Sequence, residues 1–189
     1  NLVAPCLDDV FKVCPALAES WETTSNFTVW TFKIRGDVFW HDGTRFTAED
    51  AKWWLDLAIT PPKGRRSPGW AVTFADAGIK SVEVVGGDRV RLTFGTTIPG
   101  LLNSMAGNIF YLGLPRHLMQ PQIDKGNVTV TPDQVNYVAT GPYKFQEYVK
   151  GSVVKVRRFD KFYGKDSKGR QLPFLDGVDF PIIRDQAGM

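Results

Sequence analysis

The clearest pattern along the chain is an alternation of apolar and polar residues between Phe27 and Ile34. Trp30, Phe32 and Ile34 recur at every second position, so their side chains fall on one face of an extended segment. The residues between them point to the opposite face. This pattern predicts a strand that buries one face and leaves the other in solvent.

A helix is predicted shortly after this strand. Thr47 can cap a helix N-terminus, and Asp50 stands at the position that completes a capping box, although Glu or Gln is more usual there. The helix should end at about Ile59, because Pro61 and Pro62 follow it. The residues that recur at the spacing of a buried helix face are Ala51, Trp54, Leu55 and Ala58.

The rest of the chain alternates between hairpins and short helices. One hairpin is predicted from 81–85 and 89–94, and a second from 142–149 and 152–159. This order favours an α+β fold with a mixed, largely antiparallel sheet and a few helices. The other expected elements are a helix over 99–106, a short strand over 109–112, a helical turn from Pro115, a polar linker over 120–136, a loop over 169–177 and a strand over 178–183.

Composition excludes several classes of protein. With 43% hydrophobic and 23% charged residues, this chain of 189 residues is too apolar for intrinsic disorder. It contains no apolar stretch of roughly 18 to 20 residues, which a membrane-spanning helix needs. The chain opens at Asn1 without an initiator Met and ends as abruptly at Met189, so both ends look cut. The missing signal peptide therefore says little about export.

Charge is unevenly distributed although the net charge is only +3. Residues 1–60 carry five basic and nine acidic side chains, whereas residues 142–170 carry nine basic and three acidic ones. Because aromatic residues interleave with the basic ones, a module that binds nucleic acid or another polyanion is one interpretation. The other is a hairpin with its aromatic residues facing a core and its Lys and Arg in water. We prefer the hairpin, since no nucleic-acid motif accompanies the charge.

The chain has two cysteines, Cys6 and Cys14, which flank an Asp-Asp pair. If this segment is a hairpin, the two thiols can face each other and form a disulfide, which would indicate an oxidising compartment. Two buried free thiols are the alternative. The spacing fits no zinc pattern, and His41 and His117 stand alone in sequence, so no metal site is expected.

No catalytic motif is present. The chain lacks a nucleophile elbow, a paired histidine motif and a phosphate loop. Asp37 and Asp42 could be considered as an acid–base pair, but an Asp before Gly43 has a simpler role as the cap of its own turn. We therefore expect neither an enzyme nor a cofactor.

One run of motifs is far more specific than these features. PALAESW at 15–21 is followed by WTFKIR at 30–35, HDGT at 41–44 and FTAEDA at 46–51. This order resembles the signature of the family 5 extracellular solute-binding proteins, the peptide and nickel receptors of ABC importers. Further matches extend the resemblance over essentially the whole chain. They lie at 82–94, 140–145, 162–164, 173–178 and 182–185.

The sequence departs from the family's pattern in a few places. Arg45 replaces the usual Pro, Ala139 replaces Gly, and Phe162-Tyr163 replaces Tyr-Trp. These changes affect turns and leave the resemblance intact. The segment over 65–70 is more individual, which puts ligand specificity in doubt. The signature itself is structural, because its large apolar residues are anchors on strands, namely Trp21, Trp30, Phe32, Phe39 and Trp40.

The resemblance implies part of a bilobed architecture like that of the type II periplasmic binding proteins. Residues 1–136 then correspond to the small second domain, and residues 137–189 to a returning segment of the first domain. The third domain, which closes over the ligand, would be absent. The protein would be a periplasmic or extracellular monomer, associated with the membrane through an ABC permease, that captures a peptide or a similar small solute.

The resemblance also implies ligand-facing positions near Arg66, Trp70, Asn108 and Tyr111. Trp70 has a chemical rationale, because an aromatic ring beside cationic side chains can stack on a ligand while Arg66 meets a carboxylate. The alternative is that Trp70 packs the loop onto the core and that Arg66 is solvated. For Tyr111 the alternative is a residue of a core strand.

Overall fold

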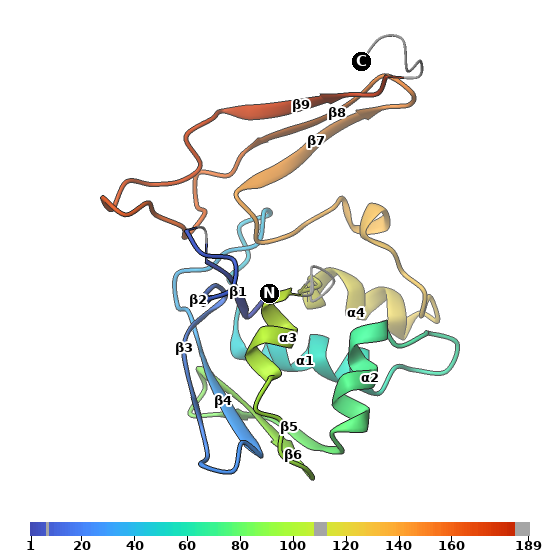
Figure 1. Ribbon diagram of the computed structural model, residues 1–189. Coiled ribbons are helices and arrows are strands. Elements are labelled where there is room, and N and C mark those ends of the chain that lie inside the picture. The colour runs from blue at the N-terminus through green and yellow to red at the C-terminus, as the bar shows by residue number, and fades with distance from the viewer. Residues whose placement is uncertain (7, 108–112, 184–189) are drawn as a thin grey trace. The chain divides into compact units, whose positions relative to one another are not determined.

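The computed structural model describes residues 1–6, 8–107 and 113–183 (Figure 1). The chain divides into two compact units. The first comprises Asn1–Gly36 and Phe46–Val130, and the second comprises Asp37–Arg45 and Thr131–Met189. Both units mix strands with helical segments, as the predicted α+β fold requires. Within the described residues every pair of neighbouring strands is antiparallel, where the sequence predicts a mixed, largely antiparallel sheet.

The first unit is built on a four-stranded sheet with the strand order β3-β4-β6-β5. Helix α1 packs against β5, β6, α2 and α4, and helix α3 packs against a separate hairpin made of β1 and β2. The elements of this unit are β1 (Val3–Pro5), β2 (Val13–Pro15), β3 (Ala18–Thr23), β4 (Val29–Ile34), α1 (Ala48–Ile59), α2 (Gly69–Asp76), β5 (Ile79–Val85), β6 (Arg89–Phe94), α3 (Leu101–Gly107) and α4 (Arg116–Asp124).

The predicted face of β4 is the buried one. Trp30, Phe32 and Ile34 are at most 4% exposed, and they share this face with Leu92 and Val90 of the neighbouring strand β6. Burying such side chains is the main favourable term in folding, at roughly 1.5 to 3 kcal/mol each. The alternation along β4 therefore locates the core of the first unit.

Helix α1 begins and ends where the sequence predicts. The Thr47 hydroxyl accepts a hydrogen bond from the Asp50 N–H at 3.4 Å, and the Asp50 carboxylate accepts one from the Thr47 N–H at 2.8 Å. The capping box is thus complete with Asp in place of Glu. The helix ends at Ile59, and its predicted core residues are all buried, namely Ala51, Trp54, Leu55 and Ala58.

Two helices differ from the predictions. Helix α2 occupies 69–76, where the sequence analysis assigns no helix; only Ala71 and Phe74 mark its buried face among the described side chains. The predicted linker over 120–136 is wrong at its start, because α4 continues through Pro121 to Asp124. The buried Met119 holds this helix to the unit, and that packing outweighs the loss of one backbone donor at Pro121.

The N-terminal hairpin carries a disulfide between Cys6 and Cys14. Its turn is held by hydrogen bonds within the loop, since the Asp9 carboxylate accepts from the Phe11 N–H at 3.0 Å and the Lys12 N–H donates to the Asp9 carbonyl. Cys6 directly follows β1 and Cys14 lies in β2, and the disulfide is present in place of two free thiols.

The second unit contains a short 3-10 helix and a three-stranded sheet. Its strand order is β7-β8-β9. A register shift between Phe145 and Glu147 keeps Tyr148 opposite Val154, on the same face as Phe145. That face is apolar but only partly covered, since Tyr148 is 53% exposed. The elements are the 3-10 helix (Pro132–Val135), β7 (Tyr143–Val149), β8 (Val153–Arg158) and β9 (Gly177–Pro181).

His41 joins two signature motifs inside the second unit. Its Nε2 lies 3.0 Å from the Gly141 carbonyl oxygen, and its Nδ1 accepts from the Ala139 N–H at 3.3 Å. The ring also meets Phe159 edge-on, with 5.1 Å between ring centroids. The HDGT motif and the segment before Pro142 therefore form one local structure, which explains why both belong to a structural signature.

Candidate functional site

The segment between α1 and α2 is the part of the predicted site that the structure describes best. Helix α1 stops because Pro61 and Pro62 cannot donate to the preceding turn, and the Thr60 N–H makes the last bond, to the Asp56 carbonyl at 2.8 Å. A basic loop follows and leads into the first turn of α2. The Arg65 N–H closes a turn by donating to the Pro62 carbonyl at 3.0 Å.

Arg65 anchors this loop to the rest of the first unit. Its guanidinium Nη1 donates to the Val128 carbonyl oxygen at 2.9 Å. The preceding Gly64 adopts a φ of +93°, and a Cβ there would lie 3.4 Å from the Val128 side chain. Burial lowers the pKa of Arg65 from its ordinary value. Arg65 is thus a structural residue that the sequence analysis did not single out.

Arg66 has the opposite environment. Its side chain is exposed, and within the described residues no carboxylate forms an ion pair with it. Because Arg65 fixes the backbone one residue before, Arg66 stands as an available guanidinium on an anchored loop. This geometry suits a ligand carboxylate, which arginine binds through two parallel hydrogen bonds.

The structure describes less of the other three predicted site residues. Trp70 lies in the first turn of α2, four positions after Arg66, and its side chain is not among those described. Asn108 and Tyr111 lie outside the described residues. The predicted strand over 109–112 lies there as well. The structure therefore places Arg66 and the backbone of Trp70 on one continuous segment and does not test the remaining contacts.

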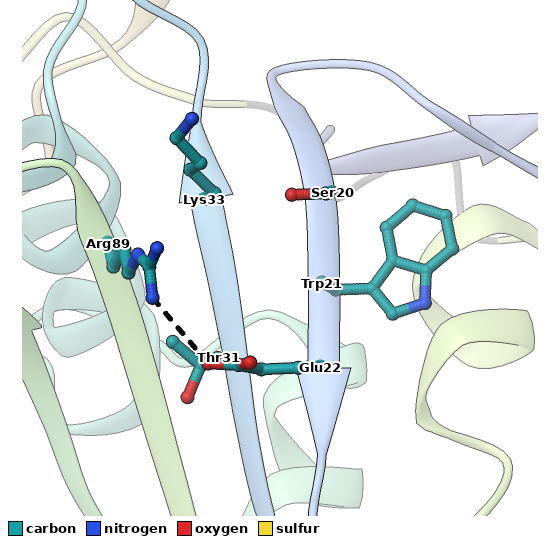
Figure 2. A pocket seen from close by; sticks show the side chains of 6 residues that line it. All are labelled: Ser20, Trp21, Glu22, Thr31, Lys33 and Arg89. Atoms are coloured by element: carbon teal, nitrogen blue, oxygen red, sulfur yellow. Dashed lines mark ion pairs between the residues drawn. The ribbon is translucent and has the colours of Figure 1, made fainter.

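The outer face of the four-stranded sheet carries a small polar depression of about 70 Å³. Figure 2 shows Ser20 and Glu22 projecting toward the neighbouring strands, with the Trp21 indole on the other side of β3. Arg89 lies 3.7 Å from the Glu22 carboxylate. Apart from Trp21, these side chains come from the outward positions of the strands, so the alternation along β3 and β4 predicts which residues line the depression.

The charges of this depression largely satisfy one another. Lys33 lies 2.5 Å from the Glu19 carboxylate, and the hydrogen bond to Glu19 raises the pKa of Lys33. Arg89 also lies 3.9 Å from Asp88. Exposed pairs of this kind contribute little to stability and leave little net charge. We therefore read the depression as a solvated sheet face and place the candidate site at the loop between α1 and α2.

Some of the basic side chains of the region over 142–170 are paired with carboxylates. By register, the face of the sheet that carries Lys144 also carries Lys155 and Arg157. Lys155 lies 2.9 Å from Glu147, and Arg157 lies 2.6 Å from Asp179. Such pairing offsets part of the positive charge on this face. It agrees with the hairpin interpretation of this stretch, although Tyr148 does not reach a core.

Solved structures that match this fold are bilobed proteins of the type II periplasmic-binding-protein class. One is the periplasmic binding protein DppA from Helicobacter pylori, with a TM-score of 0.80 over 99% of this chain and 37% of that one. Its identity of 21% makes this a likeness of fold alone.

The family follows from the sequence comparison. Residues 12–189 match the bacterial extracellular solute-binding proteins, family 5 (middle), and the chain belongs to this family. The oligopeptide-binding protein AppA of Bacillus subtilis is 26% identical over 94% of this chain and 30% of its own length. NikZ of Campylobacter jejuni, solved with Ni(L-His), is 28% identical with a TM-score of 0.72, over 93% of this chain and 32% of that one. The chain thus spans about 30% of the length of the curated relatives that it matches.

Proposed function

We propose that this chain is part of the substrate-binding component of an ABC importer, a receptor rather than an enzyme. The observation that carries the proposal is the family match over 12–189, on a fold in which the signature residues build the framework. The relatives that bind an oligopeptide or a nickel–histidine complex suggest the solute class. The proposed ligand is an oligopeptide or a similar small solute, delivered to a permease in the membrane.

The location follows from the same proposal. The family is described as extracellular, and the disulfide between Cys6 and Cys14 suits an oxidising compartment. No helix within the described residues is long and apolar enough to cross a membrane. We propose a periplasmic or extracellular receptor that meets the membrane through its permease.

We also propose that the two units correspond to two domains of the receptor. Residues 1–136 would be the small second domain, and residues 137–189 would be a segment of the first domain. The chain passes from the first unit to the second close to this boundary, after Val130, and Asp37–Arg45 also belong to the second unit. Ligand binding would then shift an equilibrium between open and closed arrangements of the whole receptor. In this scheme Arg66 and Trp70 lie at the ligand, and Asn108 and Tyr111 are further ligand-facing candidates.

Thermal-shift screening of the receptor at its natural full length tests the proposal, with short peptides, sugars, opines and metal chelates as ligands. A solute present at about 100 times its Kd stabilises the bound form by about 2.7 kcal/mol, which raises Tm by several degrees. For a solute with a carboxylate, R66A should weaken binding at least fivefold. K63A is the matched control, because Lys63 is an exposed cation of the same loop. If no solute raises Tm, or if K63A weakens binding as much as R66A, the proposed site is wrong.

A further inference from the structure

A groove of about 360 Å³ separates the C-terminal half of α1 from α4 within the first unit. The two helices pack against each other, and Figure 1 shows them side by side. The groove has apolar walls, because Leu57 comes from α1, Ile123 from α4 and Pro62 from the segment that follows α1. These walls suit the hydrocarbon part of a ligand.

An oriented tryptophan lines this groove. The Trp53 indole N–H donates to the Gln120 side-chain oxygen, and the Gln120 amide nitrogen donates to the Asp124 carboxylate at 2.6 Å. This chain of hydrogen bonds fixes the indole between the two helices. Since its N–H is already used, the ring offers a ligand its π surface and its apolar contact.

The polar side of the groove is negative. Asp56 and Thr60 line it at the end of α1, where the helix dipole is negative and no Lys or Arg occupies the last turn. None of the described lining residues is a cation. The groove therefore combines an aromatic ring, a carboxylate and a helix C-terminus, and each of these favours a positive charge.

The chain itself supplies an ammonium group to this carboxylate. Lys52, one turn before Asp56 on the same helix, forms an ion pair with the Asp56 Oδ2. Both side chains are partly exposed, at 35% and 45%, so the pair is open to exchange. Lys52 does not line the groove, but its ammonium group contacts one oxygen of the Asp56 carboxylate. A cation that binds Asp56 from the groove therefore competes with Lys52.

We infer that this groove binds an alkylammonium group, with the charge between Trp53 and Asp56 and the hydrocarbon stem along Leu57 and Ile123. A lysine side chain and the amino terminus of a peptide both provide this chemistry. The site belongs to the first unit alone and does not depend on the transport function proposed above.

This inference is tested by titrating the 189-residue chain with n-butylammonium chloride at constant ionic strength. Two-dimensional ¹H–¹⁵N NMR monitors the titration. The chain has six Trp residues, and W53F assigns the indole signal of Trp53. We expect a saturable shift of this signal, and at least fivefold weaker binding of the neutral isostere 1-butanol. Equal binding of the two compounds, or an indole signal that does not move, overturns the inference.

Two substitutions should act in opposite directions. D56N removes the charge at constant shape and should weaken butylammonium binding at least fivefold, whereas K52M removes the competitor and should strengthen it at least threefold. K33M is the matched control, because Lys33 is paired with Glu19 on the outer sheet face and should leave binding unchanged. Wild-type binding in K52M overturns the inference even if D56N fails to fold.

Two further ligands distinguish the two possible sources of the ammonium group, a lysine side chain and a peptide amino terminus. Nα-acetyl-lysine methylamide offers only a side-chain ammonium, and glycylglycinamide offers only an amino terminus. Saturable, Asp56-dependent binding of either compound supports the site and identifies the group that it prefers. If neither compound shifts the Trp53 indole signal, the inference fails for peptides and proteins as ligands.

Discussion

Replacing His41 with Phe should destabilise the second unit and remove part of its pH dependence. The ring of H41F can still pack against Phe159, but the Ala139 N–H and the Gly141 carbonyl lose their partner. An unsatisfied buried polar group costs about 1 to 3 kcal/mol. Because these two groups are half-buried and water reaches them in part, we expect a loss of about 1 to 3 kcal/mol in total.

The pH dependence follows from the protonation state that these bonds require. Nε2–H donates to the Gly141 carbonyl while Nδ1 accepts from the Ala139 N–H, so only the neutral ring satisfies both. Burial lowers the pKa of His41 from 6.5, and the charge of Lys144 adds to this, against the opposing effects of the Gly141 carbonyl and Asp42. Below pH 6.5 the unfolded state therefore binds more protons than the folded state, and stability falls as the pH falls.

Urea unfolding between about pH 8 and pH 5 measures this effect. A single proton limits the slope to about 1.4 kcal/mol per pH unit, and the partial exposure of His41 keeps the slope below that limit. The difference between wild type and H41F isolates this contribution from the carboxylates that titrate in both proteins. Hydrogen exchange at the Ala139 amide gives a local readout. Identical pH profiles for the two proteins would refute the reasoning.

Two further predictions concern stability. Replacing both Cys6 and Cys14 with Ala should lower the free energy of unfolding by about 2.5 kcal/mol, as expected for a loop with a sequence separation of 8; an unchanged urea midpoint without the disulfide would contradict this. L55A should cost about 2 to 5 kcal/mol because Leu55 is 0% exposed, whereas L175A should stay within about 0.5 kcal/mol because Leu175 is 62% exposed; equal losses measured by urea unfolding would contradict the assignment of the core.

Local sequence patterns predict those elements of the fold whose formation depends on one dominant kind of interaction. The buried face of β4 follows from alternation, and α1 follows from a capping box and two prolines. The sequence does not predict helix α2, because the described buried face of this helix consists only of Ala71 and Phe74, which is too short to give a helical period. The sequence predicts only a turn in place of helix α4, because Pro121 is a local stop signal that tertiary packing overrides.

The candidate site is less predictable than the fold because its features depend on contacts between distant segments. Arg65 and Arg66 are adjacent and chemically alike, yet only Arg65 meets the Val128 carbonyl. No local pattern distinguishes the anchoring arginine from the exposed one. Likewise, the indole of Trp53 is held in the groove by Gln120, which is 67 positions away in the sequence and is brought beside Trp53 only by the fold. These roles follow from tertiary structure, which composition and spacing do not encode.

The two units differ in how fully they cover their own apolar surface, and this difference bears on the proposed function. In the first unit, β4 and β6 bury one face against the helices, with Phe32 and Leu92 at 0% exposed. In the second unit, Tyr148 and Phe180 share a face by register and are both 53% exposed. Exposed apolar faces of this kind usually mark a surface that another part of the protein or a partner covers. Under the proposed function the remainder of the receptor covers this face, and the first unit is the part that should keep its structure when tested alone.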